Sequence, residues 1–299
     1  MKILNDKSIV TFCGKTKDTI GVVLGLDQLM RAPEKVAHGA LFEFDAEFAK
    51  ELQFLELPLV SVAYLDDDET LVALSENGDI RLYGTTGLRS ESFEPSLGPM
   101  RAVKLIGTKL FASGVSAQFF SREGDGTWTD ISPPRATDSS LRSSIVESID
   151  GFAENDIYGA GENGVIWRFD GENWAAVQTA TNLAYYAIHC ADNGVVYAVG
   201  QLGILARGRG DSFEIVPQNK EFADLWGVRL FEDALYTTSM RAMLTLEDDE
   251  LVPVLPAMEL AMTFYGLDVV DGVLWSAGEK DIIRFDGSKW SRFVDPEWV

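Results

Sequence analysis

Cysteine and histidine are scarce in this chain of 299 residues, which contains two of each. Cys13 and Cys190 lack the CxxC spacing of a zinc site and are too few for a disulfide framework, so we interpret both as small buried hydrophobic residues. His38 and His189 are the only candidates for a Ser/His/Asp site, and neither lies near a nucleophile-elbow sequence. The sequence therefore predicts no metal, no cofactor and no catalytic triad.

Long apolar runs are also lacking. No stretch approaches the roughly 18 apolar residues of a membrane span. The N-terminal "MKILNDKSIV" is interrupted by polar residues at positions 5 to 7 before it reaches signal-peptide length. We expect a cytoplasmic protein that makes no membrane contact. Amphipathic patterns of helix length are nearly absent too, except in "LDQLMRAPEKVAHGA", where we expect a short helix ending before Pro33.

Basic residues are few, since 25 Lys and Arg stand against 47 Asp and Glu, for a formal net charge of −22. Such a field repels nucleic acid and anionic membranes and attracts basic partners. High net charge is also a common means of keeping a protein soluble. The charge therefore excludes nucleic acid as a partner and leaves a basic protein partner and plain solubility as alternatives.

A repeat is the main feature that the sequence does contain. The phrase "GAGENGVIWRFDGENW", residues 159 to 174, returns as "SAGEKDIIRFDGSKW" at residues 276 to 290. Gly161 and Gly200 are separated by one step of about 40 residues, as are Trp174 and Phe213. Trp174 and Trp290 are separated by nearly three such steps. A module of about 40 residues is therefore repeated along the chain.

Each module reads as four short strands rich in Val, Ile, Tyr and Phe and bounded by Gly, Asn and Asp. Repetition of such a unit predicts an all-β fold, a seven-bladed β-propeller of four-stranded antiparallel blades in one domain. Six or eight blades, or a β-solenoid, are the structural alternatives. The predicted blades cover residues 1–58, 59–98, 99–142, 143–182, 183–222, 223–259 and 260–299.

The repeat resembles a known bacterial propeller repeat whose blades read roughly V-W/Y-A-V-G, then G-x-I-x-R/H-x-D-G, then W. The segments that carry the resemblance are "DIYGAGENGVIWRFDGENWAAV", "VVYAVGQLGILARGRGDSFEIV" and "VLWSAGEKDIIRFDGSKWSRF". In addition, "SREGDGTW" at residues 121 to 128 is similar to the Asp-box turn of sialidase-like propellers. The resemblance implies the fold alone, because propellers include binding proteins, lyases and hydrolases.

The recurring residues have structural interpretations. We expect the aromatic residue that ends each motif to pack between neighbouring blades, at Trp128, Trp174, Phe213 and Trp290. The Asp-Gly pairs at 170–171 and 286–287 suit hairpins in which a glycine adopts positive φ. Gly161 and Gly200 suit tight turns between the second and third strands of a blade.

Catalytic interpretations find little support. Sialidase chemistry needs three arginines around a carboxylate, and Arg101, Arg229 and Arg241 are available without any matching surrounding motif. The acidic runs "DDDE" and "EDDE" lack the alternating ligands and the glycine of a calcium loop. The sequence therefore favours a role other than catalysis.

Two kinds of residue are candidates for binding a protein. The predicted topology gathers acidic turns on one face, including Asp66, Asp67, Asp68, Asp150, Asp248 and Asp249. On the opposite face, Tyr186, Trp226 and Tyr265 open the innermost strand of three consecutive blades, so the repeat period separates each from the next. Exposed Tyr and Trp are typical interface anchors, with packing between blades as the alternative. Arg101 and Arg241 accompany them on that face.

We therefore predict a non-enzymatic, cytoplasmic propeller that binds another protein. The acidity suggests a sharper hypothesis, an immunity-type inhibitor that docks on a basic bacterial toxin through charge complementarity. One alternative is a carbohydrate-active or lyase propeller that uses Arg101, Arg241, Tyr186 and Tyr265 at the channel mouth. Another is a general assembly scaffold with several partners.

Overall fold

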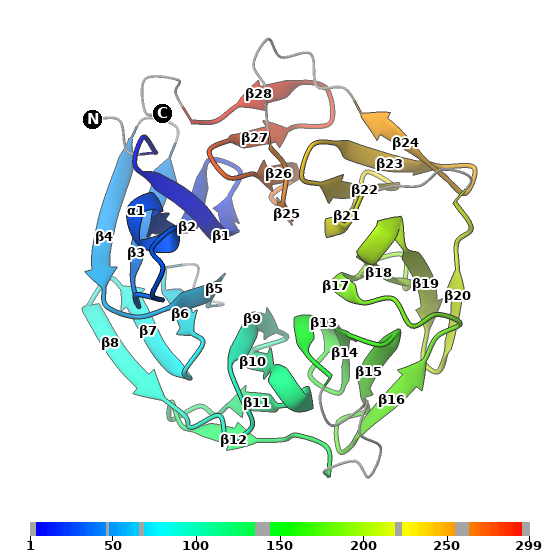
Figure 1. Ribbon diagram of the computed structural model, residues 1–299, viewed down its shortest axis with the longest axis horizontal. Helices are drawn as coiled ribbons and strands as arrows, with labels where there is room; N and C mark the ends of the chain where they lie inside the picture. The colour runs from blue at the N-terminus through cyan, green and yellow to red at the C-terminus, as the bar shows by residue number, and fades with distance from the viewer. Residues whose placement is uncertain are drawn as a thin grey trace.

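Seven four-stranded antiparallel sheets are arranged around a central axis in the computed structural model (Figure 1). The structure describes residues 4–45, 48–65, 69–134, 144–218, 223–254 and 263–294. Every sheet is built from four strands that are consecutive in the sequence and pair in chain order. The chain is thus an all-β, seven-bladed β-propeller, as the repeat predicted.

Blade one contains β1 (Lys7–Thr16), β2 (Thr19–Leu26), β3 (Gly39–Asp45) and β4 (Ala49–Leu55), and blade two contains β5 (Leu59–Tyr64), β6 (Leu71–Ser75), β7 (Asp79–Gly84) and β8 (Gly87–Ser92). Blade three contains β9 (Met100–Ile106), β10 (Lys109–Gly114), β11 (Phe119–Arg122) and β12 (Trp128–Asp130). Blade four contains β13 (Val146–Ala153), β14 (Asp156–Gly161), β15 (Val165–Phe169) and β16 (Trp174–Gln178). Blade five contains β17 (Tyr185–Cys190), β18 (Val196–Gly200), β19 (Leu205–Arg209) and β20 (Ser212–Ile215). Blade six contains β21 (Leu225–Phe231), β22 (Ala234–Ser239), β23 (Met243–Glu247) and β24 (Glu250–Val254). Blade seven contains β25 (Gly266–Val270), β26 (Val273–Ala277), β27 (Ile282–Phe285) and β28 (Trp290–Arg292).

Helical structure in the described part of the chain is confined to short pieces between strands. The predicted helix of the first blade is present as α1 (Asp27–Met30), and single 3₁₀ turns follow β10 at Val115–Ala117 and β18 at Gln201–Gly203. None of these described helices has the length and apolar character needed to cross a membrane.

Aromatic residues at the end of the repeat motif pack between blades, as predicted from the sequence. Trp174 stacks on Phe119 of the preceding blade, with ring centroids 3.6 Å apart and an interplanar angle of 12°. Trp290 meets Tyr236 of the preceding blade edge to face at 6.5 Å. Since the sheets of neighbouring blades pack face to face, a large aromatic ring in each of these blades fills space between the sheets.

Glycine has two different roles in the repeat. Gly171 and Gly287 have φ values of 100° and 86°, which confirms the prediction of hairpin turns at positive φ. Gly200, in contrast, is the last residue of β18 and lies outside the tight turn predicted for it. Its φ is −178°, an extended value open to any residue. Glycine is required there because a Cβ would lie 2.0 Å from the carbonyl oxygen of Ala184.

The innermost strands, β1, β5, β9, β13, β17, β21 and β25, surround the axis and leave one edge without a strand partner (Figure 1). Side chains of the preceding blade satisfy several backbone N–H groups along this edge. Cys190 N–H donates to Asp150 at 2.9 Å, and Val103 N–H donates to Ser61 at 3.0 Å. A backbone N–H left without a partner in the interior would lower the free energy of unfolding. These hydrogen bonds satisfy the edge and join neighbouring blades around the channel.

The ring closes between the last blade and the first without exchanging a strand, because the four strands of each described sheet are consecutive in the sequence. Lys280 crosses this seam: its ammonium group donates to the carbonyls of Leu4 and Lys7 at 2.8 Å each and to Asp27 at 2.7 Å. Leu4 is fully buried in a core cluster that includes Trp275 of β26. Hydrogen bonds and apolar packing together therefore hold the ring shut.

Candidate functional site

The mouth face of the propeller is the side on which the innermost strands begin, and three predicted aromatic residues lie there together. The rings of Tyr186 on β17 and Trp226 on β21 are stacked, with centroids 4.6 Å apart and 9° between their planes. Tyr265, next to the start of β25, meets Trp226 edge to face at 6.4 Å. Trp226 is 39% exposed, so the stack is open to solvent on this face.

Local backbone geometry explains why these rings face the mouth. In each of the three blades the residue directly before the ring is a buried hydrophobic one: Tyr185, Leu225 and Phe264. The pairing of the innermost strand with its neighbour shifts at Tyr186 and at Trp226, so both rings stand at β-bulges, which redirect a side chain from its normal place in a strand. The sequence allowed two roles at these positions, packing between blades and exposure at the mouth. In each blade the first of the two adjacent residues packs between blades and the second lines the mouth.

Carboxylates surround the aromatic stack. Burial raises the pKa of Tyr186, and the charges of Asp224, Glu147 and Glu162 raise it further. Burial and the neighbouring Glu162 also raise the pKa of Glu147, although the cation of Arg101 opposes this. Anionic groups around exposed aromatic faces form a surface suited to Lys or Arg side chains.

The two predicted arginines reach the mouth face but differ in their surroundings. Arg101 on β9 lies 3.6 Å from Glu147 and lines the channel cavity with Arg229. Arg241 is exposed in the turn between β22 and β23. The three arginines considered for sialidase chemistry therefore occupy the channel wall and a surface turn.

The predicted acidic residues are separated from the aromatic ones. Asp66, Asp67 and Asp68 lie outside the described residues. Asp248 and Asp249 form the turn between β23 and β24, on the face opposite the mouth. Their φ values of 48° and 64° are those of a type I′ hairpin, which favours Asp and Asn at both central positions, and Asp249 also pairs with Arg207. A conformational requirement thus accounts for this acidic turn.

The prediction that negative charge is concentrated on one face needs correction. Asp150, expected in an acidic surface turn, lies within β13 and is buried. Carboxylates also occur on the mouth face, where Glu279 follows β26 and Glu162 follows β14. Asp is common in tight turns, so its presence suggested a turn at each of these positions. Whether an acidic residue reaches the surface depends on where the strands begin and end.

A second ring of charged residues lies deeper in the channel, and sequence reasoning missed it. Five residues line the inner wall: Lys104, Asp150, His189, Arg229 and Asp268. They stand three positions after Arg101, Glu147, Tyr186, Trp226 and Tyr265, so both sets recur from blade to blade with identical spacing. Comparing equivalent blade positions in the sequence would have found this ring. Three of its members, Lys104, Arg229 and Asp268, line a cavity with a volume of about 230 Å³.

Asp150 and His189 form the central pair of this ring. His189 Nδ1 lies 3.1 Å from Asp150 Oδ2. Burial opposes the charged carboxylate, but the hydrogen bond from His189 and the cations Lys104 and Arg229 hold the pKa of Asp150 well below its usual range. Burial raises the pKa of the neighbouring Cys190 thiol, so this group is not an activated nucleophile. The pair and the thiol belong to the channel wall. Cys13 is buried as the sequence predicted, whereas Cys190 is half-buried, which corrects the expectation for that residue.

We expect His189 to make stability depend on pH. Burial lowers the pKa of His189, and the Arg229 cation lowers it further, although the hydrogen bond to Asp150 opposes them. The unfolded chain therefore binds more protons than the folded one once the pH falls to about 6.5, so acidification lowers the free energy of unfolding. Urea unfolding should therefore give a lower free energy of unfolding at pH 5.5 than at pH 7.5. His189→Gln should reduce the loss and His38→Gln should not; an unchanged pH dependence in His189→Gln would contradict the assignment.

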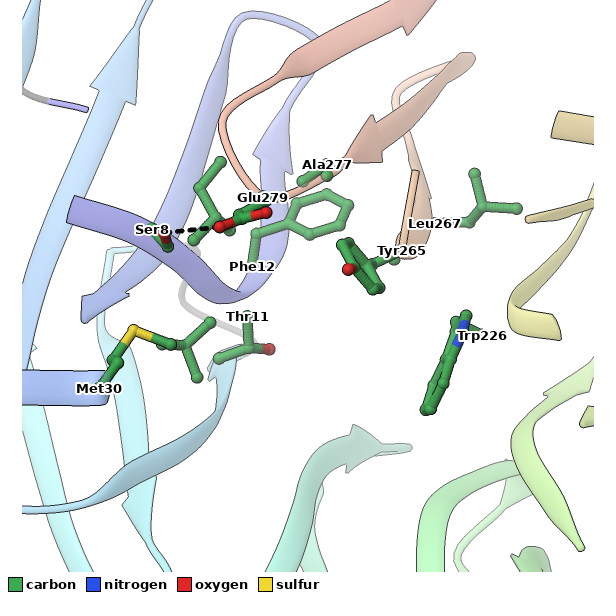
Figure 2. Close-up of a pocket in the computed structure, with 13 residues that line it drawn as sticks. Ser8, Thr11, Phe12, Met30, Trp226, Tyr265, Leu267, Ala277 and Glu279 are labelled. Atoms are coloured by element: carbon green, nitrogen blue, oxygen red, sulfur yellow. Dashed lines mark hydrogen bonds between the residues drawn. The ribbon is translucent and has the colours of Figure 1, made fainter. Parts of the chain in front are cut away.

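An apolar pocket opens beside the aromatic stack, between blades six, seven and one (Figure 2). Its volume is about 620 Å³, within the range typical of ligand-binding clefts. Trp226 and Tyr265 form one side, and Met30 of α1 lies on the other (Figure 2). The remaining lining residues are Ser8, Ile9, Val10, Thr11, Phe12, Gly266, Leu267, Ala277, Gly278 and Glu279. The mouth face thus combines an exposed aromatic stack, an apolar pocket and carboxylates.

Solved structures with the same fold include the WD40 β-propeller domain of Doa1, with a TM-score of 0.71 and 11% identity over 98% of this chain and 96% of that one. U3-55K gives 0.68 and 10% identity over 92% and 89%, and the computationally designed Ika8 protein gives 0.62 and 10% over 94% and 96%. At such identities the likeness shows the fold alone. No family model matches the chain.

Fold and site together define a seven-bladed β-propeller with an aromatic stack and an apolar pocket at the mouth of its channel. Among curated proteins, the immune protein Tsi7 of Pseudomonas aeruginosa strain PAO1 is 32% identical over 274 residues, covering 87% of this chain and 89% of Tsi7. The chain belongs to the family of the immune protein Tsi7. The prediction of a bacterial, immunity-type propeller is confirmed by this relationship.

Proposed function

We propose that this protein is an immunity protein that neutralises a basic toxin by binding it non-covalently with the mouth face. The observation that carries the proposal is the relationship to the immune protein Tsi7 along most of both chains. The exposed aromatic stack supports the choice of face, because well-packed Tyr and Trp residues contribute most of the binding energy in many interfaces. Action in the cytoplasm is part of the proposal and agrees with the two free cysteines.

Exposed apolar side chains support the mouth face independently. Nine large hydrophobic residues are exposed in the described part of the chain. Six of them belong to the mouth face or to the α1 insertion beside it: Val10, Met30, Val36, Leu202, Trp226 and Met240. Apolar side chains gathered on one face of a propeller are typical of an interaction surface.

Charge supports a basic partner. The net charge of −22 creates a field that speeds the approach of a positively charged protein. Glu147, Glu162 and Asp224 place part of that charge beside the aromatic stack. Arg101 and Arg241 would contribute the polar rim of the interface, where contacts fix orientation more than affinity.

Affinity purification of the tagged protein from its host, at low and high salt, tests the proposal. We expect mass spectrometry to identify one basic protein that is toxic when expressed alone and harmless when this protein is co-expressed. Glu162→Lys on the mouth face should weaken capture, whereas Glu172→Lys in the β15–β16 turn on the opposite face is the matched control. Several salt-insensitive partners would favour an assembly scaffold, and no protein partner would contradict the proposal.

A further inference from the structure

The pocket beside the aromatic stack is lined by an unusual share of the exposed apolar side chains. Val10 is 43% exposed and Met30 is 52% exposed, and both line this pocket together with Trp226. Exposed apolar side chains lose contact with water when a partner covers them, so such a lined hollow is typical of a binding surface. Methionine adds adaptability, because its flexible thioether can fill irregular gaps.

A β-bulge, which recurs at the start of the innermost strand in other blades, and the α1 insertion of the first blade shape the pocket. The pairing of β1 with β2 shifts between Ile9 and Thr11, so Val10 lies in a β-bulge. A bulge redirects a side chain from its normal place in the strand. The α1 insertion supplies Met30, whose sulfur approaches the backbone at Gly25 so closely that a Cβ there would lie 2.5 Å from it. Both features are part of the local backbone, so the pocket is present before any partner binds.

One carboxylate stands at the rim of this apolar pocket. Glu279 lies 3.3 Å from the Ser8 hydroxyl, which has its shorter contact, 2.6 Å, with Asp27. The neighbouring cation does not neutralise Glu279, because the Lys280 ammonium group is directed to Leu4, Lys7 and Asp27. Burial raises the pKa of Tyr265 and the Glu279 charge raises it further, which places this carboxylate near the aromatic stack.

We propose that this pocket receives a short apolar segment of the protein partner and that Glu279 pairs with a Lys or Arg beside that segment. The inference rests on the proposed function and names the chemistry recognised at one part of the mouth face. The volume of about 620 Å³ accommodates more than one side chain, so a loop or one helical turn fits better than a single residue. Apolar contact supplies affinity, and the rim carboxylate selects the basic partner.

The test measures affinity for the protein that the wild-type chain captures from its host and whose toxicity it suppresses. Val10→Trp fills the pocket from an exposed bulge and should weaken binding about 30-fold or more. Met30→Lys places a cation opposite the incoming Lys or Arg and should weaken binding about tenfold or more. Leu88→Trp on β8 is the matched control, since Leu88 is 39% exposed but lies on the outer strand of blade two.

Glu279 is tested through salt dependence. Glu279→Gln should weaken binding roughly tenfold at low salt, and the difference from wild type should shrink as salt screens the pair. Thermal unfolding of each variant should remain near that of wild type, because the substituted side chains are at the pocket surface. Wild-type affinity in Val10→Trp and Met30→Lys would overturn the inference while leaving the proposed function intact. Failure of the wild-type chain to bind any toxin would instead overturn the proposed function.

Discussion

Replacing Trp226 with alanine should weaken binding of the toxin partner by about 2 to 4 kcal/mol, or roughly 30- to 1000-fold in Kd. Trp226 stacks on Tyr186, contacts Tyr265 and also lines the apolar pocket, so its removal opens both parts of the mouth face at once. Residues at the centre of an aromatic cluster are the usual hot spots of an interface. Isothermal titration of the purified pair measures the loss directly.

A matched control separates this effect from a general loss of surface hydrophobicity. Phe54 on β4 is 44% exposed, slightly more than Trp226, but belongs to the outermost strand of blade one. Phe54→Ala should bind the partner as the wild type does. Trp226→Phe should recover part of the affinity, because a smaller ring can still stack on Tyr186. Equal affinity of Trp226→Ala and wild type would show that the partner docks elsewhere.

Replacing Asp268 with alanine should lower the free energy of unfolding by roughly 3 kcal/mol. The Asp268 carboxylate accepts a hydrogen bond from Gly14 N–H at 2.8 Å across the seam of the ring and lies 3.4 Å from two nitrogens of Arg229. The cations Lys104 and Arg229 lower its pKa although burial opposes this. Removing the carboxylate leaves an uncompensated guanidinium in the channel and an unsatisfied N–H on β1. Urea unfolding monitored by tryptophan fluorescence measures the change.

Two further variants identify the cause of that loss. Asp192→Ala, in an exposed turn, is the matched control and should change stability by less than about 0.5 kcal/mol. The double variant Asp268→Ala with Arg229→Met should regain part of the stability, because the guanidinium that lost its partner is removed as well. If the single and double variants were equally destabilised, the ion pair would not explain the effect. Wild-type stability in Asp268→Ala would contradict the role of Asp268 in closing the ring.

Much of the architecture could be predicted from the sequence because each blade repeats the same local sequence pattern. Strand residues alternate, glycine and aspartate mark the hairpins, and an aromatic residue such as Trp174 closes each motif once per repeat. Each regularity acts within one blade or between adjacent blades, where Trp174 packs on Phe119. Short-range patterns of this kind specify a repeat fold even when overall identity to other propellers is about 10%.

Only part of the candidate site could be predicted from the sequence. The regular intervals between Tyr186, Trp226 and Tyr265 predicted that these rings share one level of the channel, and the structure brings them together. The acidic turn at Asp248 and Asp249 lies on the face opposite these rings, as the predicted topology had placed it. A turn sequence records the backbone conformation that it needs, whereas its distance from another turn depends on the whole ring.

The sequence by itself determined the seven blades, their antiparallel strands and the rings at the channel mouth, because these follow from periods of 2 and about 40 residues. The tertiary structure alone decided the apolar pocket, the charged ring within the channel and the closure of the propeller. Lys280 meets Leu4 and Asp268 meets Gly14, although the partners of each pair come from opposite ends of the chain. No local pattern encodes such contacts, since they form only when the last blade is packed against the first.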